Sequence, residues 1–306
     1  MSRDYILSPL NFTGGKYKLL PQILPLFPTD INTFVDIFCG GCNVGVNVKA
    51  NRVVCNDIDS RIIGLMNYFK STTYDVLKTK IDKIIQDYKL SDSTRHEYSF
   101  YDCTSASGLG SYNRDKFLAL REYFNNLEET NSDYYLYFYI LIVFSFNNQI
   151  RFNSDGHYNL PVGKRDFNKR MQEKLEGFLS HIGNIEFRNS SFETIASDSL
   201  STNDFIYADP PYLITCATYN EKNGWNEDKE YQLLNYLDSL SNRNIKFALS
   251  NVLSSNGKEN TILKDWINNH TNYECHHLDF SYKNSNYHKK QTSDKTDEVL
   301  ITNYFL

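Results

Sequence analysis

Short apolar runs and stretches of helical spacing follow one another along this chain and predict an α/β sheet protein. The runs typical of buried strands cover residues 34–38, 52–55, 205–208, 245–250 and 299–304. Apolar residues recur at helical spacing over 62–88, 117–127 and 134–146, and again at 233–240. We therefore expect a sheet domain formed by 1–61 and 166–306, interrupted by a mostly helical insert at 62–165.

The longest apolar run, Tyr134 to Phe146, has thirteen residues, fewer than the ~20 that a membrane-spanning helix needs. It predicts a buried helix and no membrane partner. The opening MSRDYILSPLNF has no apolar core of a secretory signal. The six cysteines show no disulfide spacing, and no second ligand pair follows Cys39 and Cys42 at zinc-site spacing. We expect a cytoplasmic protein without a metal.

The overall composition, with 41% apolar and 23% charged residues, is that of a globular chain. A net charge of −5 does not exclude a nucleic-acid partner, because binding depends on where the basic residues lie and not on the total charge. Residues 149–174 hold six Lys or Arg against three acids, and residues 281–295 hold four Lys against one Asp. Both stretches are candidates for contact with a nucleic-acid backbone; solvated surface loops are the alternative.

The segment FVDIFCGGCNVG, residues 34–45, combines an acidic strand end with a glycine turn. Glycines allow the backbone to approach a ligand closely, and Asp36 offers a carboxylate for a ligand amine or hydroxyl. The fingerprint G-x-G-x-x-G is absent, so no pyrophosphate cradle is expected. Alone, the segment also fits a plain strand–helix turn.

Asp57 follows the next predicted strand, about twenty residues beyond Asp36. An acidic residue at that position commonly binds ribose hydroxyls. The alternative is a helix N-cap in the DIDSRI segment. Together with the glycine turn, the position favours the ribose role.

Asp209-Pro210-Pro211-Tyr212, after the strand FIYA, is the most specific motif in the chain. The two prolines remove backbone donors, so a carboxylate and carbonyls form a rim of acceptors at the strand's end. Such a rim suits a planar group that carries an NH₂, and Tyr212 offers a ring to stack on it. A proline pair that only ends the strand is the alternative.

The chain resembles the D-P-P-Y amino-methyltransferases that use S-adenosylmethionine, and most closely the DNA adenine methyltransferase (Dam) family. The resemblance rests on FTGGKYKLL, VDIFCGGCNVG, NDIDSRIIGLMNYF, DPPY and EVLITNY, and on the block from Arg151 to Lys164. It implies a Rossmann-like methyltransferase fold with a mixed, mostly parallel seven-stranded sheet. It also implies that the insert recognises the target.

The resemblance further implies roles for individual residues. Asp209, Pro210, Pro211 and Tyr212 would be catalytic and receive the target base. Ser191 stands where relatives usually carry an acidic residue, and Phe12 where many carry Trp. The residues implied to bind S-adenosylmethionine are Phe12, Gly14, Lys16, Asp36, Gly40, Asp57, Phe192 and Asp209. The candidates for DNA contact are Phe146, Asn147, Arg151, Asn153, Pro161, Lys164 and Lys289.

The expected activity is methylation of an exocyclic amino group of adenine that has been flipped out of double-stranded DNA. Amino-cytosine methylation is the alternative within the same chemistry. A nicotinamide-dependent oxidoreductase and a DNA-binding protein without catalysis are more distant alternatives. We expect a monomer or weak dimer from a restriction–modification or phage context. A cognate endonuclease would act on the same DNA site without touching this protein.

Overall fold

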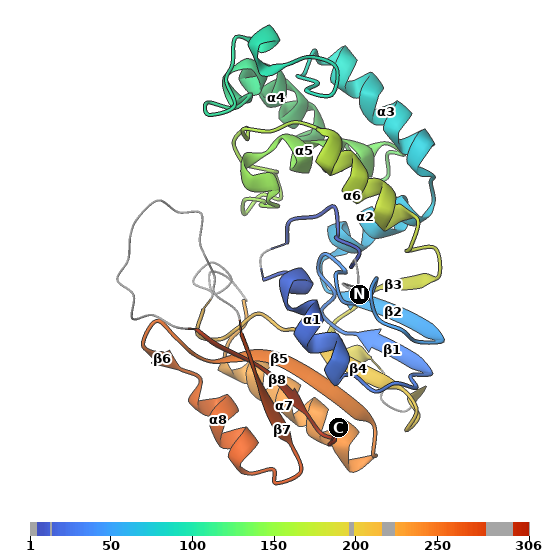
Figure 1. Cartoon of the computed structure of the whole chain (residues 1–306), viewed down its shortest axis with the longest axis vertical. Coiled ribbons are helices and arrows are strands. Elements are labelled where there is room, and N and C mark those ends of the chain that lie inside the picture. Colours follow the sequence, from blue (N-terminus) through green and yellow to red (C-terminus); the bar gives the residue numbers. More distant parts are fainter. Residues whose placement is uncertain (1–4, 13, 196–198, 216–223, 280–295, 306) are drawn as a thin grey trace. The chain divides into compact units, whose positions relative to one another are not determined.

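The structure, a computed structural model, describes residues 5–12, 14–195, 199–215, 224–279 and 296–305. The chain divides into two compact units. Unit 1 consists of Met1–Gly15, Gly40–Val46 and Asp59–Asn184, and unit 2 of Lys16–Cys39, Asn47–Ile58 and Ile185–Leu306. Unit 2 contains the sheet, and the helices between β2 and β3 in the chain belong to unit 1 (Figure 1).

The sheet of unit 2 has a continuous path of seven strands in the order β3-β2-β1-β4-β5-β8-β7, and the two-residue β6 pairs with β5 beside it. The first five strands of the path are parallel, and β8 runs antiparallel to both β5 and β7. This confirms the expected Rossmann-like methyltransferase fold. The strands are β1 (Thr33–Asp36), β2 (Arg52–Asp57), β3 (Ile185–Asn189), β4 (Phe205–Ala208), β5 (Lys246–Ser255), β6 (Lys258–Glu259), β7 (Glu274–Leu278) and β8 (Asp297–Thr302).

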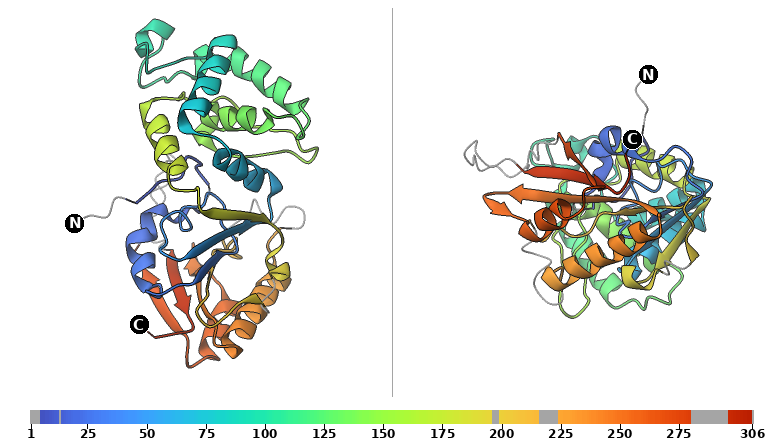
Figure 2. Two further views of the ribbon diagram at one scale, coloured as in Figure 1. Left: turned by 90° about the vertical axis from the view of Figure 1, so that its right-hand side faces the viewer. Right: turned by 90° about the horizontal axis from the view of Figure 1, so that it is seen from below.

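Side-chain alternation along the central strands gives the sheet two buried faces. Val35, Ile206 and Ala208 join one apolar core with residues of α7 and α8, which cover that face (Figure 1; Figure 2). Phe205 points to the other face, where its ring packs edge-on against Phe27 at 4.8 Å between centroids. The helical segments of unit 2 are η1 (Lys16–Leu19), α1 (Leu20–Ile23), η2 (Leu24–Leu26), η5 (Phe192–Thr194), α7 (Glu227–Asn242) and α8 (Thr261–Asn268).

Unit 1 is helical and is built around α5, whose residues are almost all buried. The apolar run therefore forms the buried helix that the sequence predicts as far as Phe144, whereas Phe146 at its end lies in η4 and is exposed. The region of helical spacing over 62–88 forms two helices, because α2 ends at Lys70 and α3 begins at Tyr74. The helical segments are α2 (Ser60–Lys70), α3 (Tyr74–Asp87), η3 (Tyr98–Tyr101), α4 (Gly110–Asn125), α5 (Tyr134–Phe144), η4 (Phe146–Asn148) and α6 (Lys169–Leu179).

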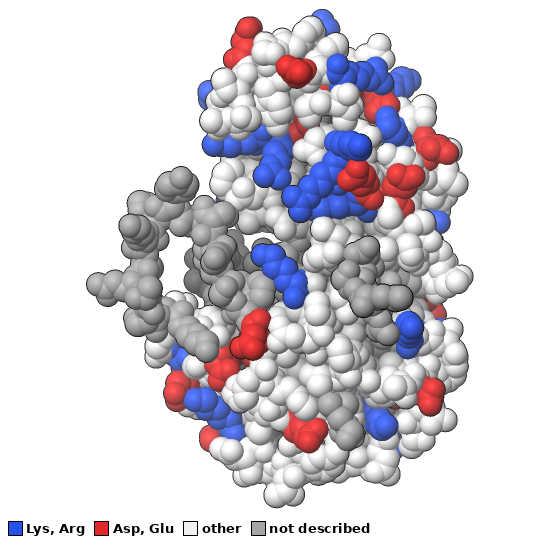
Figure 3. Space-filling view, in the orientation of Figure 1, with Lys and Arg blue, Asp and Glu red and all other residues white. Residues whose placement is uncertain are grey.

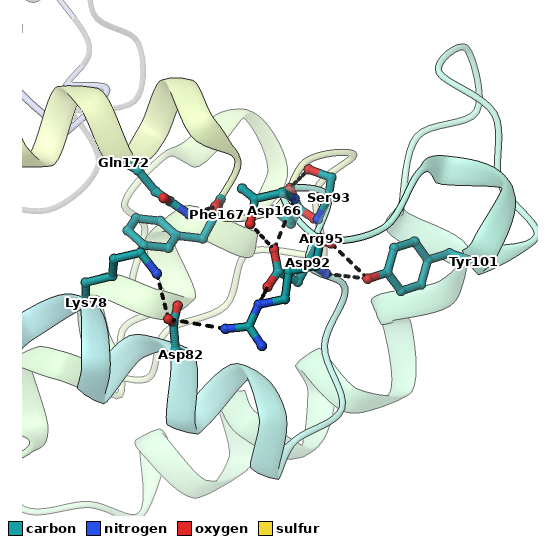
Figure 4. A network of polar contacts seen from close by, with 10 residues as sticks. Lys78, Asp82, Asp92, Ser93, Arg95, Tyr101, Asp166, Phe167 and Gln172 are labelled. Carbon is teal, nitrogen blue, oxygen red and sulfur yellow. Dashed lines mark hydrogen bonds and ion pairs between the residues drawn. The ribbon is translucent and has the colours of Figure 1, made fainter.

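A buried carboxylate orders the polar segment that begins at Ser91 in unit 1 (Figure 4). Asp166 accepts hydrogen bonds from the Ser91 hydroxyl at 3.1 Å, and from the amide and hydroxyl of Ser93 at 2.7 and 2.6 Å. The hydroxyl of Tyr101 accepts a bond from the amide of Asp92 at 2.7 Å and donates one to its carbonyl at 3.0 Å. The Asp166 carboxylate is thus buried and hydrogen-bonded inside unit 1, although Asp166 lies within the basic stretch 149–174 of the sequence.

Candidate functional site

The D-P-P-Y turn lies at the carboxyl end of β4, in the middle of the sheet. β4 is buried along its whole length and pairs in parallel with β1 and β5. Asp209 follows its last residue directly, and the two prolines that come next cannot continue a ladder of hydrogen bonds. The chain order reverses between β1 and β4, which is where open α/β sheets bind ligands beyond the strand ends.

The other two predicted acids end the neighbouring strands. Asp36 is the last residue of β1 and Asp57 is the last residue of β2. The register pairs Asp36 with Tyr207 of β4 and with Cys55 of β2, so the three strands end at one edge. The tertiary structure therefore brings Asp36, Asp57 and Asp209 to the same edge of the sheet.

Asp57 is not the cap of the helix that follows. Asp59 occupies the N-cap of α2, where its carboxylate accepts the amide of Arg61 at 3.0 Å. The backbone carbonyl of Asp57 accepts a hydrogen bond from the side-chain amide of Asn189 at 2.9 Å, which joins β2 to β3. The N-cap interpretation of Asp57 is therefore wrong, and its carboxylate ends a strand instead of starting a helix.

The carboxylate of Asp209 is held by one side chain from another element and by one from its own turn. The ammonium of Lys16, in η1, lies 2.8 Å from Oδ1, and the hydroxyl of Tyr212 donates to Oδ1 at 3.1 Å. The same ammonium lies 4.9 Å from the centre of the Tyr212 ring. Oδ2 accepts no hydrogen bond from the residues that the structure describes, and 18% of the side chain remains exposed. One oxygen is thus fixed and the other is available to a ligand.

A fourth side chain completes this group and was missed from the sequence. Glu298 on β8 is fully buried, accepts the Tyr212 hydroxyl at 3.1 Å and lies 3.5 Å from the Lys16 ammonium. The signal was present, since a glutamate stands at the start of the apolar strand EVLIT. A charged residue in a buried strand is rare unless it is paired, but its partners cannot be read from the sequence.

Burial raises the pKa of both central acids. The pKa of Asp36 stands well above its ordinary value because the side chain is buried and the neighbouring Asp209 adds repulsion. The pKa of Asp209 is also raised by burial, while the charge and hydrogen bond of Lys16 oppose the rise and Glu298 adds to it. The edge of the sheet therefore carries an excess of acidic groups over cations, and it suits a positively charged ligand.

Phe192 lies in an aromatic cluster beside the ends of β1 and β3. Its ring centre is 5.4 Å from that of Phe38 and 6.0 Å from that of Trp225. Trp225 is fixed by a hydrogen bond from its indole to the buried Glu230 at 2.5 Å. Ser191, which replaces the acid usual in relatives, donates its hydroxyl to Glu193. The predicted pocket residue thus has rigid aromatic neighbours that sequence reasoning did not select.

The predicted cofactor residues Phe12, Gly14 and Gly40 belong to unit 1. Gly40 has a φ of +45°, and a Cβ placed there would come within 2.9 Å of the Phe12 ring. Ser8 donates its amide to the side chain of Asn43 at 3.1 Å, which ties the N-terminal segment to the glycine turn. The small residue at position 40 is required by the ring of Phe12, a reason that its sequence context does not reveal.

The candidates for DNA contact form an ordered loop at the end of α5. Bridges join Ser145 with Val162 and Phe152 with Tyr158, which gives the segment a hairpin-like form. Asn153 accepts amides from Asp155 and His157 and so shapes the turn. Arg151 Nε donates to the Asn159 side chain at 2.7 Å.

Four other candidates stand around this loop. Phe146 is 46% exposed, and Asn147 has a φ of +55°. Pro161 accepts the amide of Phe146 at 2.9 Å, and Lys164 is exposed. Lys289 lies outside the described residues.

Basic side chains also cluster on α6 and on the segment before it, and they add positive charge to the candidate residues for DNA contact. Lys174 has a pKa lowered by burial and then by repulsion from Arg170 and Arg165, which shows that the three charges are close together. Figure 3 shows Lys and Arg side chains gathered over the region of unit 1 that contains α6. Mutual repulsion of this kind is relieved by an anionic partner.

Within the part of the chain that the structure describes, none of the helices combines the length and apolarity needed to cross a membrane.

The strand order and the acidic, proline-stiffened end of β4 define a protein of the Rossmann-like methyltransferase class. The family model of the D12 class N6 adenine-specific DNA methyltransferases matches residues 12–284, and the chain belongs to this family. This confirms the kinship inferred from the D-P-P-Y motif and the segments around it.

Three relatives illustrate the similarity. Modification methylase StsI of Streptococcus sanguinis is 42% identical, and Type II methyltransferase M.FokI of Planomicrobium okeanokoites is 40% identical, each over 99% of this chain. The chain spans 44% of the length of each of these two proteins. A DNA adenine methylase of Salmonella typhi is 25% identical over 79% of both chains.

Proposed function

We propose that this protein transfers a methyl group from S-adenosylmethionine to the exocyclic amino group of adenine in a short sequence of double-stranded DNA. The observation that carries the proposal is how the two carboxylate oxygens of Asp209 are hydrogen-bonded. Its side chain is partly exposed, and its Oδ1 is held by Lys16 and Tyr212, while Oδ2 accepts no hydrogen bond from the described residues. A carboxylate that is fixed through one oxygen can accept a hydrogen bond from the amino group of a base through the other.

The amino group of adenine is a weak nucleophile because its lone pair is delocalised into the ring. Asp209 would accept one N–H, and a carbonyl in the Pro210 region would accept the other, which favours a tetrahedral nitrogen. Lys16 and Tyr212 would keep the carboxylate from turning away as charge develops. The ring of Tyr212 would stack on the base with the face that Lys16 does not cover.

The donor set at the sheet edge fits S-adenosylmethionine. Burial and then repulsion from Asp209 raise the pKa of Asp36, with a smaller effect from Asp57, and a cationic ligand would relieve the repulsion. Asp57 would bind ribose hydroxyls and Phe192 would border the adenine ring. Phe12, Gly14, Lys16 and Gly40 are assigned to the cofactor by the resemblance. The cofactor, once bound, supplies a methyl group on a sulfonium, which is electrophilic without a protein nucleophile.

Double-stranded DNA is the proposed substrate, and the helical unit is the proposed contact. Base flipping costs a few kcal/mol, which backbone contacts must offset. The cluster of Arg165, Arg170 and Lys174 supplies basic charge for them. Phe146 and Asn147, on the exposed turn after α5, are proposed to fill the space that the base leaves. Arg151, Asn153, Pro161, Lys164 and Lys289 complete the proposed DNA-binding set, and 62–165 is the proposed target-recognition insert.

Adenine is preferred over cytosine because the matching family and the Salmonella typhi relative are described as adenine-specific or adenine methylases. The names of the StsI and M.FokI relatives place those proteins among modification enzymes. We therefore propose a restriction–modification role, in which an endonuclease would share the DNA site but not contact this chain.

The proposal is tested by incubating the protein with tritiated S-adenosylmethionine and duplex DNA and identifying the modified nucleoside. N6-methyladenine is expected, N4-methylcytosine would support the alternative, and the absence of any methylated base would refute the function. Asp209→Ala should lower the rate by at least about 10²–10³-fold while DNA binding is retained. Undiminished methylation by that variant would refute the site assignment.

Asp204→Asn is the matched control. Asp204 is another buried acid next to β4, but it lies at the amino end of the strand, where it accepts the amides of Thr33 and Ser201 at 2.9 and 2.7 Å. The Asp204→Asn change should lower the free energy of unfolding and leave the methylation rate of the folded protein unchanged.

A further inference from the structure

Glu298 reaches the proposed site because β8 runs against its neighbours. The parallel strands β1 and β4 end at the site and β5 continues past it to Ser255, whereas the antiparallel β8 begins there. Glu298 is the second residue of β8 and pairs with Val252 of β5 and Leu278 of β7. An antiparallel strand thus brings its first residues to the edge where parallel strands have their last ones.

Glu298 contacts the same two groups that hold Asp209. Its Oε1 accepts the Tyr212 hydroxyl and faces the Lys16 ammonium at 3.5 Å. That hydroxyl and that ammonium also contact Oδ1 of Asp209 at 3.1 and 2.8 Å. The carboxylates of Asp209 and Glu298 are therefore both within reach of one ammonium and of one hydroxyl, whose single hydrogen they share.

A buried glutamate is costly unless its partners compensate it, and a lone ion pair is weak evidence for a stabilising role. Here the glutamate restricts the two side chains that fix the reactive carboxylate. Without it, the Tyr212 hydroxyl could rotate away and Lys16 could move to either oxygen of Asp209. The oxygen Oδ2 would then no longer be reserved for a substrate.

We propose that Glu298 is a positioning residue, which holds Tyr212 and Lys16 on Oδ1 of Asp209 and so keeps Oδ2 directed to the amino group of the target base. This inference rests on the proposed function. It assigns a role to a side chain that touches neither the base nor the cofactor in the proposed mechanism.

The role has an electrostatic consequence that can be measured. The charged and titratable groups that act on Asp209 are Lys16, which lowers its pKa, and Glu298, which raises it. Asp36 on β1 and Tyr207 on β4 also interact with Asp209. Replacing Glu298 by Gln removes one negative charge while retaining an acceptor for the Tyr212 hydroxyl. The pKa of Asp209 should then fall, and the acidic limb of the pH–rate profile should move to lower pH.

The decisive experiment compares Glu298→Gln and Glu298→Ala with the wild type and with Asp204→Asn. For Glu298→Ala, kcat should fall about 100-fold, as expected when a reacting group loses its alignment, with little change in KM for S-adenosylmethionine. Glu298→Gln should lose less of kcat and show the shifted acidic limb. Asp204→Asn should lose stability without either effect.

A purely structural role predicts other results. If Glu298→Gln had the kcat and pH profile of the wild type, or if both Glu298 variants changed only the melting temperature, the proposal would be overturned. If Glu298→Ala does not fold, Glu298→Gln still decides through its pH profile.

Titration of the Asp209 carboxyl provides a readout that does not need activity. The ¹³C signal of that carboxyl can be assigned with Asp209→Asn and followed against pH in the wild type and in Glu298→Gln. A lower pKa in the variant is expected, and an unchanged pKa would refute the coupling. A wild-type protein that methylates no DNA would refute the proposed function, and the titration would separately decide whether Glu298 acts on Asp209.

Discussion

The ring of Phe12 packs directly on Gly40, so closely that a methyl group on the glycine would come within 2.9 Å of the ring. The two residues lie in different predicted motifs, the F-T-G-G-K block and the glycine turn after β1. Their contact joins these motifs in unit 1 and explains why position 40 needs a glycine, whose φ of +45° also disfavours a side chain.

Gly40→Ala should therefore reduce the free energy of unfolding by about 1–3 kcal/mol, because the added methyl group overpacks the site. Chemical denaturation would measure the loss. Combining the change with Phe12→Ala should recover part of it, as a double-mutant cycle can show. Gly177→Ala in α6 is the control, since no atom lies near its added methyl group, and it should not destabilise. Equal losses at both positions would contradict the packing argument.

Lys16→Met should move the acidic limb of the pH–rate profile to higher pH, opposite to the shift expected for Glu298→Gln. Lys16 holds down the pKa of Asp209 by its charge and its hydrogen bond, so its loss raises that pKa. Because two buried carboxylates lose their shared cation, the free energy of unfolding should also fall by about 3–5 kcal/mol. Shifts in the same direction for both variants would contradict the arrangement.

Asp36→Asn should stabilise the protein at neutral pH and weaken its binding of S-adenosylmethionine. The pKa of Asp36 is well above its ordinary value in the folded state. The folded state therefore binds this proton more tightly than the unfolded state, and the resulting stability is lost as the pH rises through the folded pKa. Asparagine avoids this loss and can still accept the Phe38 amide.

Thermal unfolding at several pH values would measure the gain in stability, and calorimetry would measure the loss of affinity for the cofactor. The gain over the wild type should grow as the pH rises from about 4 towards neutrality. A variant that melts at a lower temperature than the wild type at neutral pH would refute the prediction.

Arg170→Ala and Lys174→Ala should weaken DNA binding and make it less dependent on salt. Each lost phosphate contact should reduce the slope of log K against log salt by about 0.9. Fluorescence anisotropy with a labelled duplex at several salt concentrations gives that slope. Lys246→Ala is the control, because Lys246 lies at the amino end of β5, away from the carboxyl ends where Asp36 and Asp209 lie. Equal changes for the control and the α6 variants would exclude a specific basic surface.

Much of the sheet was predictable because buried parallel strands are continuous apolar runs. The prediction for β4 matched at both ends, and α5 was recognised from its apolar run. The strands β3 and β7 were not recognised, since they lie at the two edges of the sheet and carry polar residues such as Glu186, His276 and His277. A half-exposed edge strand has no apolar run to reveal it.

What the sequence alone determined is local: the apolar runs of the central strands, the glycine and proline turns, and the acids Asp36, Asp57 and Asp209 that stand in or directly after those runs. These depend on the conformational limits of a few adjacent residues. Only the tertiary structure decided that Glu298 lies beside Lys16 and Tyr212, that Phe12 covers Gly40, and that Asp59 rather than Asp57 caps α2. The first two contacts join residues far apart in the chain through strand order and packing. The third depends on where a strand stops and a helix starts, which the hydrogen bonds of both elements settle together.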